Sequence, residues 1–135
     1  MRYEIIGSPP EKNSTSAVRE DFDRFLTGLE QSDIRSVSVV FGFAWGMEIY
    51  DGDWTKLNLS INELRKRVET AESQNLGRIG CDDLHVTVPE LNIEQTYCHE
   101  TDVHIVADSE ANLHLEAQRK FWLEHGWDVS ARHVA

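Results

Sequence analysis

The segment Leu84–Ala107, LHVTVPELNIEQTYCHETDVHIVA, decides the fold of this chain. Three runs rich in β-branched and aromatic residues lie within it, at Leu84–Val88, Ile93–Cys98 and Val103–Ala107. A proline-glutamate pair separates the first two runs, and four polar residues separate the last two. Short strands at this spacing, with turn residues between them, predict a β-meander.

Helical patterns precede this meander. Residues 16–31 carry apolar side chains at helical spacing and charged side chains on the other face, which predicts an amphipathic helix. Ser60 and Glu63 have the spacing of a capping box. We expect a second helix to start there and to continue until Asn75 and Gly77 stop it.

A third helix is expected after the meander. Asp108 or Ser109 can cap its start, and Gly126 sits where a glycine commonly ends a helix. Its apolar face is predicted to consist of Leu113, Ala117 and Phe121, flanked by Leu115 and Trp122.

Strand patterns also occur outside the meander. Met1–Ile6 is predicted to be a short strand that ends at Gly7 and the Ser-Pro-Pro sequence behind it. Ser36–Tyr50 has the composition of a strand with a bend, and the Asp51-Gly52 turn predicts a return along Trp54–Leu59. Alternating apolar and polar residues near the C-terminus predict a closing strand.

These elements predict a single α+β domain over residues 1–135. Its expected order is β-α-β-β-α-β-β-β-α-β, with three helices packed against a largely antiparallel sheet of about six or seven strands. Such a length suffices to bury a core without help from disulfides or metal ions. We therefore expect both cysteines, Cys81 and Cys98, to be reduced.

The chain has a net charge of -11, and no apolar run is long enough for a membrane helix. The N-terminus also lacks the apolar stretch of a signal peptide, so we expect a cytoplasmic protein. Between Arg78 and Arg119 there is no lysine or arginine, but there are nine carboxylates. They are Asp82, Asp83, Glu90, Glu94, Glu100, Asp102, Asp108, Glu110 and Glu116.

This acidic span would repel nucleic acids and anionic membranes and attract basic proteins. Small size and negative charge are also found in inhibitors of cationic proteins, including immunity proteins that block toxic nucleases. The sequence therefore predicts a protein-interaction module with a basic protein partner, neither nucleic acid nor membrane. The predicted partner-binding residues are Trp54, Glu90, Glu94, Glu100 and Asp102.

The seven residues CHETDVH raise an alternative, a site for a metal ion or small ligand. Strand parity would place a His/Cys/Asp cluster on one face of the sheet, formed by His85, Cys98, Asp102 and His104. Against this stands the absence of close ligand pairs such as C-x2-C or H-x3-H. No metal or other cofactor is therefore assigned, and a plain hairpin connection is preferred.

Catalytic patterns are weaker still. No G-x-S-x-G nucleophile motif occurs. Asp82 and Asp83 directly after Cys81 disfavour a thiolate there, and Cys98 and His99 would point to opposite faces of a continuous strand. The sequence favours a binding protein over an enzyme and assigns no catalytic residue.

A third alternative is a homodimer interface. It would use exposed tryptophans as anchors, because tryptophan is favoured in interaction hot spots. The four candidates are Trp45, Trp54, Trp122 and Trp127.

Overall fold

The computed structural model describes residues 2–43, 45 and 55–134. The strands are β1 (Arg2–Ser8), β2 (Ser36–Phe41), β3 (Lys56–Ser60), β4 (Leu84–Val88), β5 (Ile93–Cys98), β6 (Asp102–Ala107) and β7 (Asp128–Val134). The α-helices of these described ranges are α1 (Thr15–Gln31), α2 (Ile61–Ser73) and α3 (Leu113–Glu124), and a short 3₁₀ helix, η2 (Pro89–Leu91), connects β4 to β5. The predicted α+β class and the predicted order of strands and helices are confirmed.

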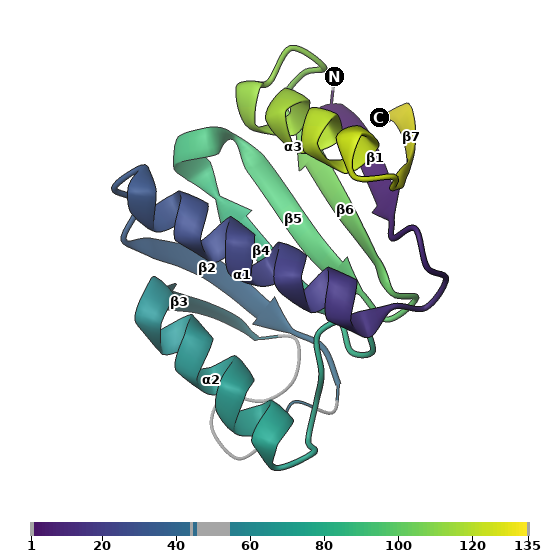
Figure 1. Cartoon of the computed structure of the whole chain (residues 1–135). Coiled ribbons are helices and arrows are strands. Elements are labelled where there is room, and N and C mark those ends of the chain that lie inside the picture. Colours follow the sequence, from purple (N-terminus) through teal and green to yellow (C-terminus); the bar gives the residue numbers. More distant parts are fainter. Residues whose placement is uncertain (1, 44, 46–54, 135) are drawn as a thin grey trace.

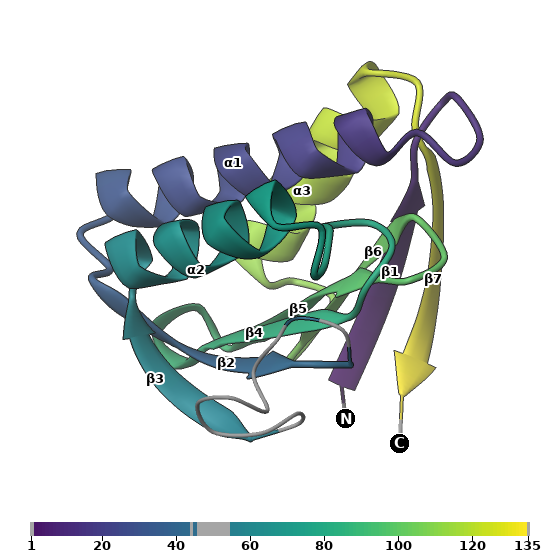
Figure 2. The same ribbon diagram turned by 90° about the horizontal axis from the view of Figure 1, so that it is seen from below.

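The strands form a seven-stranded sheet in the order β3-β2-β4-β5-β6-β1-β7, and every neighbouring pair is antiparallel. The predicted meander of β4, β5 and β6 lies at its centre (Figure 1). Figure 2 shows all three α-helices on the same side of the sheet. We call the opposite side, which none of these helices covers, the open face.

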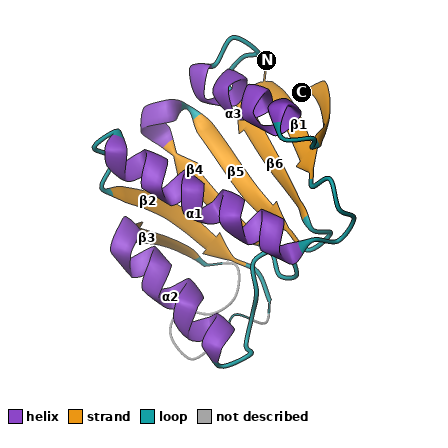
Figure 3. Ribbon diagram, in the orientation of Figure 1, coloured by secondary structure: helices purple, strands orange, loops and turns teal. Residues whose placement is uncertain are grey.

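The core lies between the helices and the sheet. Alternate strand residues such as Ile5, Val86 and Ile105 point toward the helices and are fully buried. The amphipathic helix predicted at 16–31 is confirmed as α1, which lies over the sheet in roughly the direction of its strands (Figure 3). Its buried apolar residues are Val18, Phe22, Phe25, Leu26 and Leu29.

A buried carboxylate anchors the helices to the sheet. Asp21 of α1 is 1% exposed, and its carboxylate accepts hydrogen bonds from Tyr97 Oη of β5 at 3.0 Å and from Trp122 Nε1 of α3 at 2.9 Å. Gln118 and Arg24 donate to the same carboxylate at 2.9 and 2.8 Å. Burial raises the pKa of Asp21, although these hydrogen bonds act against that rise.

The polar network continues from Tyr97 into α3. Gln95 Nε2 donates to Tyr97 Oη at 2.8 Å, so Gln95 Oε1 is left to accept from His114 Nε2, 2.9 Å away. Burial lowers the pKa of His114 to about 4. The imidazole is therefore neutral near pH 7 and serves as a hydrogen-bond donor.

The start and the buried face of α3 differ from the prediction. Asn112, rather than Asp108 or Ser109, caps the helix by accepting from the Leu115 backbone N–H at 3.1 Å. Asp108 instead accepts a hydrogen bond from the Asn112 side chain. Leu115 and Trp122 form the buried face, and Leu113 is 86% exposed. The bond from Trp122 to Asp21 fixes this rotation of the helix.

The first strand runs two residues beyond the predicted end at Ile6. Gly7 is part of β1, where it pairs with Val103 and Val129 in the neighbouring strands. A Cβ atom at Gly7 would lie 2.5 Å from the Trp122 ring. Glycine is therefore used here for close packing of α3 on the sheet, and it does not break the strand.

The prediction of exposed tryptophan anchors is wrong for three of the four residues. Trp45, Trp122 and Trp127 are 1%, 0% and 7% exposed and belong to the core. Trp54 and the predicted Asp51-Gly52 turn lie outside the described residues, as do residues 44 and 46–50 of the predicted strand Ser36–Tyr50. The described part of that strand, β2, ends at Phe41. In the described part of the chain, no helix is both long enough and apolar enough to cross a membrane.

Asp21→Ala should lower the free energy of unfolding by about 2–4 kcal/mol, because it leaves buried donors on β5 and α3 without an acceptor. Asp23→Ala is the control on the same helix, since Asp23 is exposed and pairs with Arg19 at the surface; its cost should stay below about 1 kcal/mol. Urea unfolding measures both. If both variants lose the same free energy of unfolding, Asp21 does not anchor the helices to the sheet.

Acid should destabilise the fold through His114. Its folded-state pKa lies below the unfolded value, so the unfolded chain binds the proton first and stability falls as the pH drops from 6.5 to 4. His114→Gln removes this titration but retains an amide donor. Between those pH values the wild type should lose on the order of 3 kcal/mol more than the variant in urea unfolding. Parallel pH profiles would refute the assignment.

Candidate functional site on the open face

The connection between β5 and β6 is short and tightly held. Cys98 pairs directly with Asp102, and the Thr101 backbone N–H donates to the Cys98 carbonyl at 3.1 Å. Thr101 has φ +63°, a left-handed conformation that is costly for a β-branched residue. Its buried hydroxyl donates to the Gly80 carbonyl at 3.0 Å, and this bond helps to hold the turn. The observed connection is one residue shorter than the predicted one, because Asp102 already belongs to β6.

This register brings three different donor types together. Asp102 and His104 are two residues apart on β6 and point to the open face, and Cys98 lies opposite Asp102. The thiol sulfur, a carboxylate oxygen and an imidazole nitrogen all lie within 4.8 Å of one another. All three residues are partly buried. We call Cys98, Asp102 and His104 the hairpin triad.

A second carboxylate orients His104. Nε2 of His104 lies 3.2 Å from Asp102 Oδ1, and Nδ1 lies 3.4 Å from Glu4 Oε2 on β1. Glu4 is buried, and its other oxygen accepts from Arg132 Nε of β7 at 2.7 Å. Asp102 of β6 and Glu4 of β1 thus lie at the two ring nitrogens of His104, and Arg132 of β7 holds Glu4 in turn.

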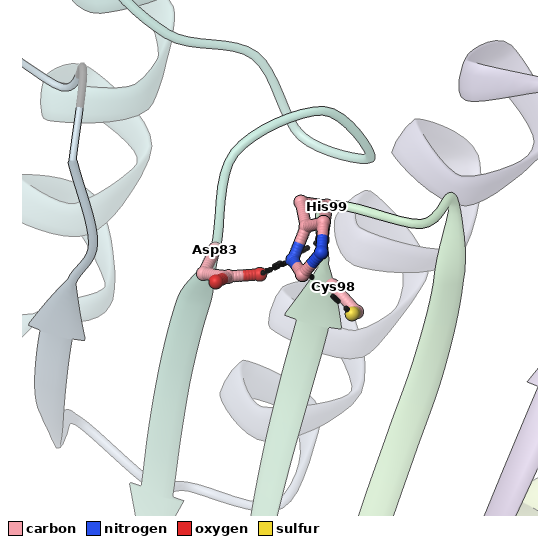
Figure 4. Close-up of side chains that lie close together, drawn as sticks. All are labelled: Asp83, Cys98 and His99. Carbon is pink, nitrogen blue, oxygen red and sulfur yellow. Dashed lines mark hydrogen bonds and ion pairs between the residues drawn. The ribbon is translucent and has the colours of Figure 1, made fainter.

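A second group of donors shares the same thiol. Figure 4 shows Asp83 and the His99 ring pointing toward one another, with Cys98 on the other side of the imidazole. Asp83 Oδ1 accepts from the His99 backbone N–H at 2.8 Å and lies 3.0 Å from Nδ1, which is 3.8 Å from Cys98 Sγ. We call Asp83, Cys98 and His99 the turn triad.

Electrostatics favour the thiol form of Cys98 and the charged form of its neighbour. Burial, with Asp102 and Asp83 nearby, raises the pKa of Cys98 to about 11. The hydrogen bond and charge of Asp83 raise the pKa of His99. Burial acts to raise the pKa of Asp83, but the bonds from His99 outweigh it and the pKa is lowered. Cys98 is thus protonated near pH 7, which disfavours a nucleophilic role.

The structure gives a different reason against a catalytic Cys98–His99 pair from the opposite strand faces expected from the sequence. Strand β5 ends at Cys98, so His99 lies in the turn and reaches back toward the sulfur. Opposite strand faces therefore do not separate the two side chains. The high pKa of the thiol, caused by burial and neighbouring carboxylates, is what opposes proton loss.

His85, the remaining member of the predicted cluster, lies apart from both triads. It faces Thr96 on β5, and its Nδ1 lies 3.0 Å from the Thr96 hydroxyl. Thr96 in turn pairs with His104, so a whole strand separates the two histidines. Two strand spacings amount to roughly 10 Å, too far for shared coordination of one ion. The structure brings together three of the four predicted residues.

The predicted partner-binding residues occupy different places. Glu94 and Asp102 have the strand parity of the open face. Glu90 lies in the β4–β5 connection and Glu100 in the β5–β6 turn, at opposite ends of β5. Trp54 lies outside the described residues. The predicted partner-binding carboxylates are therefore spread over both ends of β5 and the open face.

Three residues of the site were missed at the level of sequence: His99, Asp83 and Glu4. Asp83 was counted in the acidic span, but nothing in the sequence connects it to His99, 16 residues further along the chain. His99 stands next to Cys98, so a turn placing the two side chains together could have been considered. Glu4 is 100 residues away from His104, and no local pattern connects them. Comparison of the chain with known protein families, curated proteins and solved structures finds no significant match.

The hydrogen bond of the Thr101 hydroxyl should make a measurable contribution to the free energy of unfolding. Thr101→Val keeps the shape but leaves the buried Gly80 carbonyl unpaired, so it should cost about 1–2 kcal/mol in urea unfolding. Thr101→Ser retains the hydroxyl and should cost less than half as much. If serine and valine destabilise equally, the hydroxyl bond is not what secures the turn.

Proposed function

We propose that this chain is an acidic protein-interaction module that binds a basic protein. The proposed contact surface is the end of the sheet at which β4 starts and the β5–β6 hairpin turns. We call this surface the acidic end. Its carboxylates are those of Asp82, Asp83, Glu100 and Asp102.

The observation that carries the proposal is the kind of ion-pair partner at this end. On the helices, carboxylates such as Glu30 and Glu72 pair with arginines, which are always charged. At the acidic end, Asp83 and Glu100 pair with His99, and Asp102 pairs with His104. Histidine neutralises a carboxylate only when it is protonated. Asp83 favours the charged form of His99, but the four carboxylates of this end outnumber the two histidines, so negative charge remains for a partner even when both histidines are protonated.

An exposed aromatic ring lies at the same end. The Gly42 backbone N–H donates to the Asp83 carbonyl at 2.9 Å, and Phe43 directly follows with 66% of its surface exposed. Aromatic side chains are enriched in protein interfaces, where they fill apolar pockets. Acidic groups around such a ring would accelerate the encounter with a basic protein and select it.

Size and charge suit an inhibitor of a cationic protein, in the manner of an immunity protein. Such an inhibitor needs no catalytic group of its own, because occupying the positive surface of its target suffices. The high pKa of Cys98 agrees with a binding role. The proposed partner is thus a protein with a basic surface and an apolar recess for Phe43.

Two charge reversals with the same change in net charge test this proposal. Glu100→Lys alters the acidic end, and Glu90→Lys alters an exposed residue at the other end of β5. Binding to a panel of small basic proteins, such as a lysozyme, a ribonuclease and a cytochrome c, should weaken with added salt. At low salt, Glu100→Lys should reduce the affinity about fivefold more than Glu90→Lys.

Surface plasmon resonance over a salt series gives both the affinity and the association rate. Binding that ignores ionic strength would defeat the proposal, as would the absence of binding to every member of the panel. An equal effect of the two reversals would show that net charge, and not the acidic end, attracts basic proteins.

A further inference from the structure

We infer that the hairpin triad, Cys98, Asp102 and His104, binds a divalent cation of the zinc type. The set combines a soft thiolate, an imidazole and a carboxylate, which are the ligand types that Zn²⁺ and Co²⁺ accept together. This site goes beyond partner binding: it shares Asp102 with the acidic end, but Cys98 and His104 are not among the groups proposed to contact the partner.

The distances suit a tetrahedral ion. Zinc ligands lie about 2.0–2.3 Å from the metal, which puts neighbouring donor atoms roughly 3.3–3.8 Å apart. The donors of the triad already lie within 4.8 Å of one another. Side-chain adjustments on the order of 1 Å would complete the geometry. Direct pairing of Cys98 with Asp102 gives this arrangement a rigid base.

Glu4 lies where a carboxylate commonly binds the second ring nitrogen of a metal-binding histidine. Such a carboxylate accepts the proton of the nitrogen that does not bind the metal, and it thereby aims the other nitrogen at the ion. Nδ1 of His104 faces Glu4, so Nε2 is left toward Asp102. Arg132 holds Glu4 from the other side. This orientation is independent of the distances within the triad.

Charge also favours an ion at this place. With a thiolate, a carboxylate and a neutral imidazole, the ligands would carry two negative charges, which a divalent cation neutralises. Binding requires Cys98 to release its thiol proton to solvent. Three protein ligands leave a fourth position of the tetrahedron for water or an external ligand.

The turn triad competes for the same sulfur and is the weaker candidate. His99 has 59% of its side chain exposed, and its Nδ1 lies 3.0 Å from Asp83. Among the described residues, no second carboxylate on a strand holds its ring in the way that Glu4 holds the partly buried ring of His104. In the hairpin triad every ligand stands on a strand, and the ring of His104 already faces the other ligands.

Cobalt titration of the reduced full-length chain tests the inference. Co²⁺ bound to a thiolate gives a near-ultraviolet charge-transfer band and, in tetrahedral sites, intense visible bands. We expect one cobalt per chain, displaced by Zn²⁺, with both features lost in Cys98→Ser and weakened in His104→Gln. Glu4→Gln should lower the affinity by about tenfold or more.

Matched controls separate the two triads and the two proposals. Cys81→Ser removes the other cysteine, His99→Gln disrupts only the turn triad, and Glu100→Lys alters only partner binding; all three should retain the cobalt bands. Circular dichroism verifies the fold of each variant. No stoichiometric binding by the wild type would overturn the inference. So would bands that survive His104→Gln but disappear in His99→Gln.

Discussion

One-sided covering of the sheet is the constraint on which the rest of the structure depends. The α-helices of the described residues all lie on one face, and Asp21 secures this cover by accepting hydrogen bonds from both β5 and α3. Strand residues alternate between the two faces, so apolar side chains such as Val103 and Ile105 fill the core. The residues between them necessarily point to the open face. That is why a thiol, carboxylates and imidazoles can gather there without disturbing the core.

The same hairpin serves two proposed roles, which share the carboxylate of Asp102 and otherwise use different side chains. Its tip carries the exposed Glu100, which suits recognition of a basic protein. Its strands carry the hairpin triad, whose partly buried donors suit a small cation. Thr101 connects the two roles, because its bond to Gly80 sets the register that places the tip and the triad. Loss of this turn would disturb both proposed roles together.

Local sequence patterns predicted the strands and helices well, but they could not predict contacts between residues far apart in the sequence. The strands of the meander and the capping box of Ser60 and Glu63 follow from spacing alone, and both are observed. Strand parity also anticipated the approach of Cys98, Asp102 and His104. The place of β1 between β6 and β7 has no local signal, so the contact of Glu4 with His104 could not be foreseen. For the same reason, the buried face of α3 was predicted around Leu113, although Asp21 and Gly7 position Trp122 instead.

Register is what brings the donor atoms of the proposed cation site together. Pairing Cys98 with Asp102 places a sulfur beside an imidazole whose second nitrogen is held by Glu4. X-ray absorption at the zinc edge of the zinc-loaded protein tests this most directly. One sulfur neighbour at about 2.3 Å, with nitrogen or oxygen neighbours at about 2.0–2.1 Å, is the expected result. A first shell of nitrogen and oxygen alone would contradict it.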